Sequence, residues 1–308
     1  MATTGTHPPA VSIVEVGPRD GLQDETLVLS TEQKLAYIAA VRRAGVRRME
    51  VVSFARPDRV PQMADAEQVL AGLDDPQDGY IGLVLNQRGL QRALQTALGE
   101  INVVVLASDS FSQRNQGMST EAARDMAAEV LTGARQAGLR TGAVVSAAFG
   151  CPYEGEIDPH RVIALAAALA DAGAHEISLA DTIGCAVPVD VEALCREVRA
   201  AIDVPLRIHL HNSRSTGLAN VIAAISGGVT AIDASTGGIG GCPFAAGATG
   251  NIATEDLAYM LSRSGIETGV DLPRLLEAVE LLESTLGRTT PGSLAKAGLF
   301  PVDRTDRV

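Results

Sequence analysis

The stretch EISLADTIGCAVPVDVEALCREVRAAIDVPLRIHL, residues 176–210, holds two short apolar segments on either side of a longer amphipathic one. We expect strands at 176–179 and 206–210, with a helix near 189–201 between them. A strand, a helix and a second strand in this order imply parallel strands joined by a right-handed crossover. The stretch therefore predicts one unit of an α/β fold.

The same alternation continues on both sides of this unit. We expect helices between and after the strands, the first near 31–44, where Ser30 and Gln33 form a capping box and Gly45 ends the helix. Eight units favour a closed (β/α)8 TIM barrel. The alternative is a doubly wound open sheet, but the first strand leads into GPRDG and not into a G-x-G-x-x-G turn. The expected strands are 12–16, 48–53, 80–85, 101–107, 141–147, 176–179, 206–210 and 231–234, and the other expected helices lie near 62–72, 87–97, 119–137, 159–172, 189–201, 215–227 and 252–264.

Three segments follow from this pattern. A chain of 308 residues can bury a large core as one domain. We expect residues 1–10 to be disordered or extended and residues 11–265 to form a catalytic barrel. Residues 266–308 should form a helical C-terminal extension packed on that barrel.

Charge and composition exclude several classes of protein. The net charge of −12 disfavours binding to nucleic acid, which requires a basic face. No apolar run is long enough to span a membrane. The four cysteines, which lack CxxC spacing, indicate free thiols and a cytoplasmic protein; they are Cys151, Cys185, Cys195 and Cys242. We expect a homo-oligomer, a dimer or a tetramer.

Candidate metal ligands follow two of the expected strands. In barrels of this kind the chemistry lies at the carboxyl ends of the strands. His209 and His211 are two residues apart on one strand, so their side chains share a face. Asp20 follows the first strand, beside Arg19, although the segment GPRDG also suits a surface turn. Two imidazoles and one carboxylate suit Mn²⁺, Mg²⁺, Fe²⁺ or Zn²⁺.

A glycine-rich segment, GGIGGCPFAAGATGN, follows the last expected strand at 237–251. It could cradle a phosphate through its backbone amides. Its length and Cys242 favour a flexible lid that brings a thiol over the site. Asn251 starts the next expected helix, where it could be the N-cap or could offer an oxygen to a metal.

Two further acids lie at strand ends. Glu50 lies within the second expected strand, and Asp181 follows the sixth. A carboxylate within an apolar strand is costly unless it is paired. Arg19 is a plausible partner for either acid, so an ion pair with a purely structural role remains open for each.

These motifs together resemble those of 3-hydroxy-3-methylglutaryl-CoA lyases, within the wider superfamily of metal-dependent barrel lyases. The resemblance covers roughly residues 11–265 and is most specific in GGIGGCPFAAGATGNIATEDL at 237–257. It implies cleavage of 3-hydroxy-3-methylglutaryl-CoA, or of a close 3-alkyl analogue, to acetyl-CoA and acetoacetate or its analogue. VEVGPRDGLQDE, SFARPDRVPQM, GCPYEG, EISLADTIG and HLHN add to the match.

The resemblance also implies roles for individual residues. Mg²⁺ or Mn²⁺ would be the divalent cation. Arg19 would face the thioester carbonyl, Cys242 would be the catalytic thiol, and Asp20 or His209 would accept a proton. The implied metal ligands are Asp20, His209, His211 and Asn251, and the implied substrate-binding set is Arg19, Gln23, Glu50, Ser178 and Asp181.

Two departures from the family put the substrate in doubt. Gly142, Ala143 and Val144 stand where members often carry Arg-Gly-Tyr, and Thr26 stands where many carry Lys. Both changes predict a more apolar or roomier acyl pocket. Three alternatives stay open: a lyase or aldolase for another tertiary hydroxy acid, such as a citramalyl-type substrate; a condensing enzyme of the isopropylmalate-synthase type; and a metal-binding barrel without activity.

Overall fold

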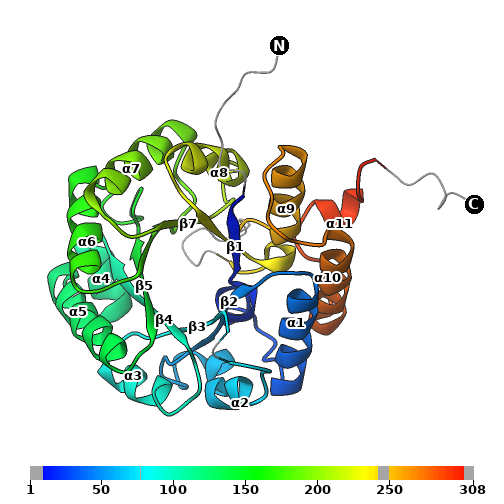
Figure 1. The fold of residues 1–308 in the computed structure, drawn as a ribbon, viewed down its shortest axis with the longest axis horizontal. Helices are drawn as coiled ribbons and strands as arrows, with labels where there is room; N and C mark the ends of the chain where they lie inside the picture. Colours follow the sequence, from blue (N-terminus) through cyan, green and yellow to red (C-terminus); the bar gives the residue numbers. More distant parts are fainter. Residues whose placement is uncertain (1–9, 77, 242–249, 302–308) are drawn as a thin grey trace, which may run out of the picture.

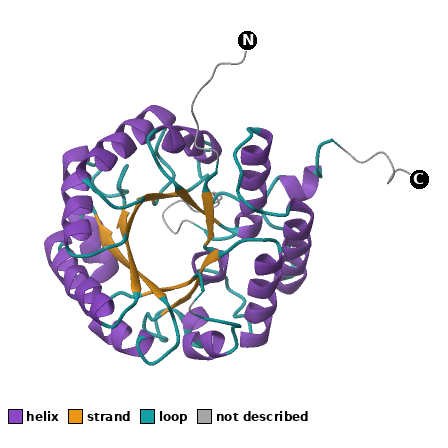
Figure 2. Cartoon of the chain, viewed as in Figure 1, coloured by secondary structure: helices purple, strands orange, loops and turns teal. Residues whose placement is uncertain are grey.

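Eight parallel strands close into a barrel surrounded by helices (Figures 1 and 2). The computed structural model describes residues 10–76, 78–241 and 250–301. Each strand pairs with the next, and β1 pairs with β8 to complete the ring. The predicted TIM barrel is confirmed, and so are all eight predicted strands. Their bounds are β1 Ser12–Glu15, β2 Arg48–Ser53, β3 Tyr80–Leu83, β4 Glu100–Leu106, β5 Arg140–Ser146, β6 Glu176–Asp181, β7 Leu206–Leu210 and β8 Ala231–Ala234.

The helices differ more from the prediction than the strands do. One helix was missed: α4, Asp109–Gln116, has the polar sequence DSFSQRNQ, which lacks an apolar period. The helix expected near 62–72 is a 3₁₀ turn, η2 (Pro61–Met63), followed by α2. The remaining bounds are α1 Thr31–Arg43, α2 Ala66–Ala71, α3 Gln87–Ala93, α5 Thr120–Gln136, α6 Pro159–Asp171, α7 Pro188–Ala201, α8 Gly217–Ser226, α9 Thr254–Arg263, α10 Leu272–Leu286 and α11 Leu294–Ala297.

The start and end of α1 follow the local signals in the sequence. The Ser30 hydroxyl accepts from the Gln33 amide, and the Gln33 side chain accepts from the Ser30 amide, which forms the predicted capping box. Gly45 follows with a φ of +93°, a conformation that side chains with a Cβ rarely adopt. Gly45 therefore ends the helix and turns the chain towards β2.

Strand β7 shows how the two faces of the barrel wall differ. Leu206, Ile208 and Leu210 are fully buried and belong to the main hydrophobic core. Arg207 and His209 alternate with them and so point into the barrel. The barrel interior is therefore charged at this strand, while the layer between strands and helices is apolar.

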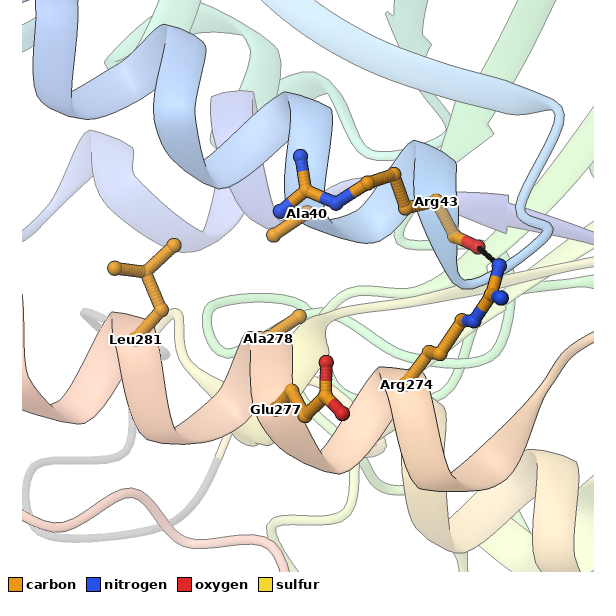
Figure 3. Close-up of a pocket in the computed structure, with 6 residues that line it drawn as sticks. All are labelled: Ala40, Arg43, Arg274, Glu277, Ala278 and Leu281. Carbon is orange, nitrogen blue, oxygen red and sulfur yellow. Dashed lines mark hydrogen bonds between the residues drawn. The ribbon is translucent and has the colours of Figure 1, made fainter.

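Helices α10 and α11 lie outside the eight strand–helix units, and α10 packs beside α1 (Figure 1). A hollow of about 360 Å³ lies between α1 and α10, on the outer surface of the molecule (Figure 3). It is lined by Ala40, Arg43, Arg274, Glu277, Ala278 and Leu281. Its place outside the ring separates it from the barrel mouth, where barrel chemistry occurs.

Among the described residues, no helix combines the length and apolar character needed to cross a membrane.

A buried carboxyl group links the C-terminal extension to the end of β8. Glu255, in the first turn of α9, is 0% exposed and accepts a 2.9 Å hydrogen bond from the amide of Gly237. Gly292, from the extension, donates its amide to the carbonyl of Gly237 at 2.8 Å. A Cβ at residue 292 would come within 1.9 Å of Glu255 Oε1, so only glycine fits there. Burial raises the pKa of Glu255 to about 7.

We expect Glu255→Gln to change how stability depends on pH. Between pH 4.5 and about 7, Glu255 ionises in the unfolded chain but stays protonated in the folded one. The wild type should therefore lose about 1.4 kcal/mol of stability per pH unit over this window, relative to a non-titrating side chain. The loss should level off above pH 7. Glutamine can still accept the bond from Gly237.

Urea unfolding of both proteins from pH 4.5 to 8.5 would measure this difference. The difference in unfolding free energy, Glu255→Gln minus wild type, should increase by about 3 kcal/mol between pH 4.5 and 7. The matched control is Glu277→Gln on the exposed face of α10, which should follow the wild type at every pH. Parallel pH profiles for Glu255→Gln and the wild type would contradict the prediction.

Candidate metal centre and active site

A single helical turn after β1 places Arg19 and Asp20 at the barrel mouth. Gly17–Gly21 forms a π-helical turn, in which the carbonyl of Val16 accepts from the amides of Arg19, Asp20 and Gly21. The sequence GPRDG was considered as a surface turn, but Gly17, Pro18 and Gly21 are buried. π-helical turns are rare in proteins as a whole, and those that occur are often at functional sites.

Asp20, His209 and His211 meet at one point. Each offers one ligand atom, and these atoms all lie within 4.8 Å of one another. The two imidazole rings have centroids 5.0 Å apart. Nδ1 of His211 is buried and has no hydrogen-bond partner within the part of the chain that the structure describes, which is costly unless another group binds it. A nitrogen and oxygen donor set with an unpartnered buried nitrogen fits a divalent transition metal or Mg²⁺.

The segment after the glycine-rich loop brings Asn251 to the same point. Backbone bonds from Asn212 to Gly250 and from Ile252 to Leu210 hold this segment against the end of β7. Asn251 Nδ2 donates to Asp20 Oδ2 at 2.8 Å, so its amide oxygen is the atom that could bind a cation. The expectation that Asn251 could cap the next helix is wrong, because α9 begins at Thr254.

A glycine makes this approach possible. A Cβ at Gly240, where φ is +102°, would come within 2.5 Å of Asn251 Nδ2 and 3.1 Å of the Cα of Gly21. Residue 240 therefore lets three backbone segments meet at the candidate metal centre.

Asp20 and His211 differ in their affinity for protons. Burial alone would raise the pKa of Asp20, but the charge of Arg19, together with those of His209 and His211 at the low pH where these imidazoles are protonated, outweighs it and holds the pKa below its ordinary value. Burial and the neighbouring His209 lower the pKa of His211 to about 4. Asp20 is therefore a carboxylate and His211 a neutral imidazole at neutral pH, which are the forms that bind a cation.

Arg19 is held from two sides. It donates to Glu50 Oε1, and its Nη1 donates to Asp20 Oδ1 at 2.8 Å. Glu50 is in turn held by Asn102 Nδ2 at 2.6 Å. A contact from Arg19 to Gln23 is long, at 3.5 Å. The guanidinium is thus fixed beside the metal centre with only 13% of its side chain exposed.

The other predicted site residues lie differently. Asp181, considered as a partner of Arg19, accepts instead from the backbone amides of Cys185 and Ala186 and organises its own loop. Ser178 is buried on β6, and its hydroxyl has no hydrogen-bond partner among the described residues. Cys242 lies outside the described residues. Its predicted role as the catalytic thiol stays a prediction.

Two residues that the sequence analysis missed support the site from within the barrel. Asp233 on β8 lies 3.3 Å from His209 Nδ1, and Asn102 on β4 holds Glu50. Both lie in otherwise apolar strands, where an unpaired polar group would be costly. The rule that singled out Glu50 could therefore have found both.

The fold and the site together define a TIM-barrel protein with a candidate divalent-metal centre at the carboxyl ends of its strands. The HMGL-like family model matches residues 10–282, and the chain belongs to this family. At the level of the family, its function is that of an oxo-acid lyase.

Two characterised relatives have different substrates. The chain is 42% identical to the (R)-citramalyl-CoA lyase of Chloroflexus aurantiacus, over 94% of this chain and 95% of that one. It is 40% identical to the hydroxymethylglutaryl-CoA lyase of Bacillus subtilis, over 92% of this chain and 96% of that one. The two identities are nearly equal, so sequence identity alone does not choose between the two activities.

Solved structures agree with the fold. The HMG-CoA lyase of Bacillus subtilis superposes with a TM-score of 0.91 at 40% identity, covering 94% of this chain and 98% of that one. A second match is an HMG-CoA lyase of Acinetobacter baumannii in complex with coenzyme A and 3-methylmalate. It superposes with a TM-score of 0.89 at 37% identity, covering 98% of this chain and 100% of that one.

Proposed function

We propose that the protein is a divalent-metal-dependent carbon–carbon lyase that cleaves 3-hydroxy-3-methylglutaryl-CoA or a close 3-hydroxy-3-alkyl analogue. The observation that carries the proposal is the meeting of Asp20, His209 and His211 directly beside the fixed guanidinium of Arg19. This arrangement pairs a cation site with a separate positive charge, and the reaction needs both.

The protein's residues would divide the work as follows. Asp20, His209, His211 and Asn251 would hold Mg²⁺ or Mn²⁺. The bound cation would bind the tertiary hydroxyl and lower its pKa. Arg19 would donate hydrogen bonds to the thioester oxygen, where negative charge develops during cleavage.

Cleavage would transfer one proton and break one carbon–carbon bond. A base beside the metal takes the hydroxyl proton, and Asp20 and His209 are the candidates. His209 can take this role only while one of its ring nitrogens carries neither a proton nor the cation, whereas a carboxylate such as Asp20 has a second oxygen. The single bond between C3 and its oxygen becomes the double bond of a ketone as the bond between C2 and C3 breaks. The electron pair moves into the CoA thioester fragment as an enolate, whose oxygen faces Arg19. The proton that the base took then passes to the enolate carbon, with the thiol of Cys242 as the proposed carrier, and acetyl-CoA forms.

Strand β5 would form one wall of the acyl pocket. Arg140, Gly142, Val144 and Ser146 alternate along the strand and share the face towards the barrel interior. Val144 and Ser146 are partly exposed, whereas their neighbours Ala143 and Val145 are buried under the helices. Gly142 leaves room for Asn102, because a Cβ there would lie 2.1 Å from Asn102 Oδ1. The partly exposed residues of this wall would therefore be Val144 and Ser146, both of which have small side chains.

A second substrate has specific support. The relative from Chloroflexus aurantiacus is a citramalyl-CoA lyase, and it is 42% identical over nearly the whole chain. Citramalyl-CoA carries the carboxylate directly on the carbon that bears the hydroxyl group. Its cleavage requires the same cation, the same base and the same stabilisation of an acetyl-CoA enolate. It yields pyruvate in place of acetoacetate.

We expect a panel of thioesters to identify the substrate. The panel would hold 3-hydroxy-3-methylglutaryl-CoA, analogues with longer C3 chains and citramalyl-CoA, each assayed with Mg²⁺ or Mn²⁺ for release of acetyl-CoA. Each extra buried methylene contributes about 0.8 kcal/mol, or roughly fourfold, if the pocket accepts it. A longer chain should therefore exceed the methyl compound by about tenfold in kcat/KM.

The variant Val144→Tyr tests whether β5 sets this preference. The larger ring should remove the advantage of the longer chains and leave the methyl compound favoured. A wild-type enzyme that strongly prefers the methyl compound would contradict the roomy pocket but not the lyase assignment. Cleavage of citramalyl-CoA alone would assign the second substrate, and release of acetyl-CoA from none of the panel would overturn the proposed function.

Three further expectations stay predictions. They are that the chain forms a dimer or tetramer, that it acts in the cytoplasm, and that residues 11–265 form the catalytic unit with 266–308 as its extension. The coenzyme A bound in the Acinetobacter baumannii relative supports the proposal that this chain also takes a CoA thioester.

A further inference from the structure

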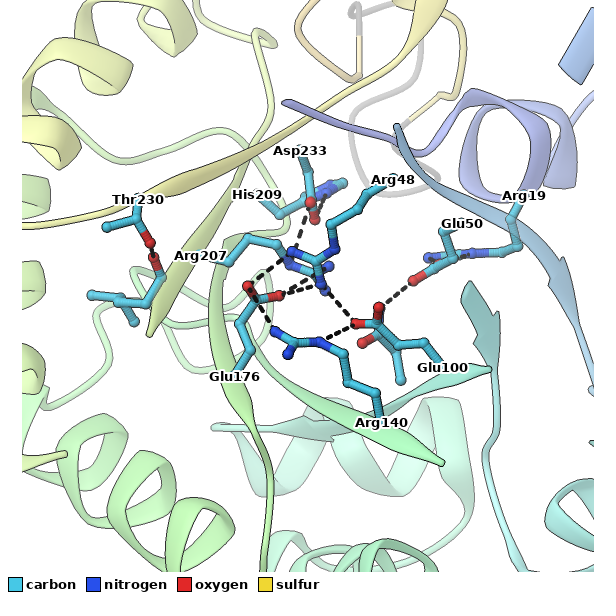
Figure 4. A network of polar contacts seen from close by, with 12 residues as sticks. Arg19, Arg48, Glu50, Glu100, Arg140, Glu176, Arg207, His209, Thr230 and Asp233 are labelled. Atoms are coloured by element: carbon cyan, nitrogen blue, oxygen red, sulfur yellow. Dashed lines mark hydrogen bonds and ion pairs between the residues drawn. The ribbon is translucent and has the colours of Figure 1, made fainter. Parts of the chain in front are cut away.

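A chain of alternating charges runs through the barrel interior beneath the metal centre (Figure 4). At its lower end, Arg48 donates to Glu100 at 2.6 Å and to Glu176 at 2.9 and 3.0 Å. Arg207 lies next, with Nη1 3.5 Å from Glu176. Nε of Arg207 lies 3.4 Å from Asp233. The chain therefore connects the bottom of the barrel to its mouth.

Asp233 lies between a buried cation and a candidate metal ligand. Its Oδ1 faces Arg207, and its Oδ2 faces His209 Nδ1 at 3.3 Å. Asp233 is 4% exposed and Arg207 is 1% exposed. The Asp233 carboxylate therefore lies between a buried guanidinium and the imidazole of a candidate metal ligand.

This contact is a hydrogen bond only for one arrangement of the protons on His209. A carboxylate accepts hydrogen bonds and does not donate them, so Nδ1 of His209 must be the protonated nitrogen in this contact. Nε2 then keeps its lone pair and is the nitrogen that can bind a cation. Metal-binding histidines commonly hold their orientation through such a contact to a carboxylate.

We propose that Asp233 is a positioning residue, which orients His209 for the metal, and that the buried guanidinium of Arg207 holds the Asp233 side chain in place. Arg207 suits this task because it reaches Asp233 with one nitrogen and Glu176 with another. Among the described residues, Nε and Nη1 of Arg207 have no hydrogen-bond partner, so the contact with Asp233 acts through charge more than through geometry. The inference rests on the proposed metal site.

We expect Asp233→Asn to weaken the binding of Mn²⁺ by about 10–100-fold, as is typical for the partners of metal-binding histidines. Titration calorimetry with Mn²⁺ and no substrate would measure this directly. Kinetics at saturating Mn²⁺ should recover much of kcat, because added metal compensates for a weaker site. Arg207→Met should weaken binding less, because Asp233 remains.

A matched control separates positioning from general damage to the charge chain. Glu100 is buried in the same chain, where it accepts from Arg48, but it does not contact Asp233 or His209. Glu100→Gln should lower thermal stability while leaving Mn²⁺ affinity within about threefold of the wild type. Equal losses of affinity in Glu100→Gln and Asp233→Asn would overturn the proposal.

A second test observes His209 itself in the wild type. With ¹⁵N-labelled histidine and Mg²⁺ bound, nitrogen chemical shifts should show His209 protonated on Nδ1, with the signal assigned by its loss in His209→Gln. Protonation on Nε2, or a folded Asp233→Asn protein that binds Mn²⁺ as the wild type does, would overturn the role of Asp233. A wild type that binds no divalent cation would instead overturn the proposed metal site.

Discussion

Arg19→Met should lower kcat by about 100–1,000-fold, the loss seen when one oxyanion donor is removed from other enzymes. Arg19 is the cation fixed beside Asp20, and Glu50 holds its guanidinium in place. Methionine keeps the length of the side chain but removes the charge that would stabilise the enolate oxygen. The measurement is kcat and KM for the best thioester at saturating Mn²⁺.

Metal binding should survive this change. Arg19 places a positive charge next to Asp20, so its removal should leave the affinity for Mn²⁺ equal or tighter. Because Glu50 would lose its cation, the double variant Arg19→Met/Glu50→Gln controls for a buried unpaired carboxylate. Turnover of Arg19→Met within threefold of the wild type would show that Arg19 is only a structural partner of Glu50.

Removing the metal should abolish turnover. A chelator would take the cation from Asp20, His209 and His211, and added Mg²⁺ or Mn²⁺ should restore activity. His209→Ala should weaken Mn²⁺ binding by at least about 10–100-fold, because changes to the partners of ligands alone cost that much. Undiminished cleavage after chelation would contradict the proposed mechanism.

A second histidine provides the matched control for His209→Ala. His160 is exposed in the first turn of α6 and does not belong to the group formed by Asp20, His209 and His211. His160→Ala should bind Mn²⁺ and turn over as the wild type does. A loss of affinity in both variants would indicate a general effect of removing histidine and would not support a site at His209.

The sequence by itself determined the eight strands, helix α1 and the pairing of His209 with His211 at the site. The capping box at Ser30 and the turn at Gly45 act within a few residues, so α1 could be predicted from local chemistry. The two-residue repeat of a strand places His209 and His211 on one face whatever the strand packs against. Short polar elements such as α4 escaped the prediction because they carry no apolar period.

Only the tertiary structure decided which distant groups meet. Asp20 and Asn251 are 231 residues apart, and they touch because β1 pairs with β8 when the barrel closes. The choice of Glu50 over Asp181 as the partner of Arg19 likewise depends on how the strand ends are arranged around the mouth. The contact between Asp233 and His209 requires the register of β7 against β8. Local sequence sets backbone conformation and the facing of side chains, whereas contacts across the barrel depend on closure and register, which no short stretch of sequence contains.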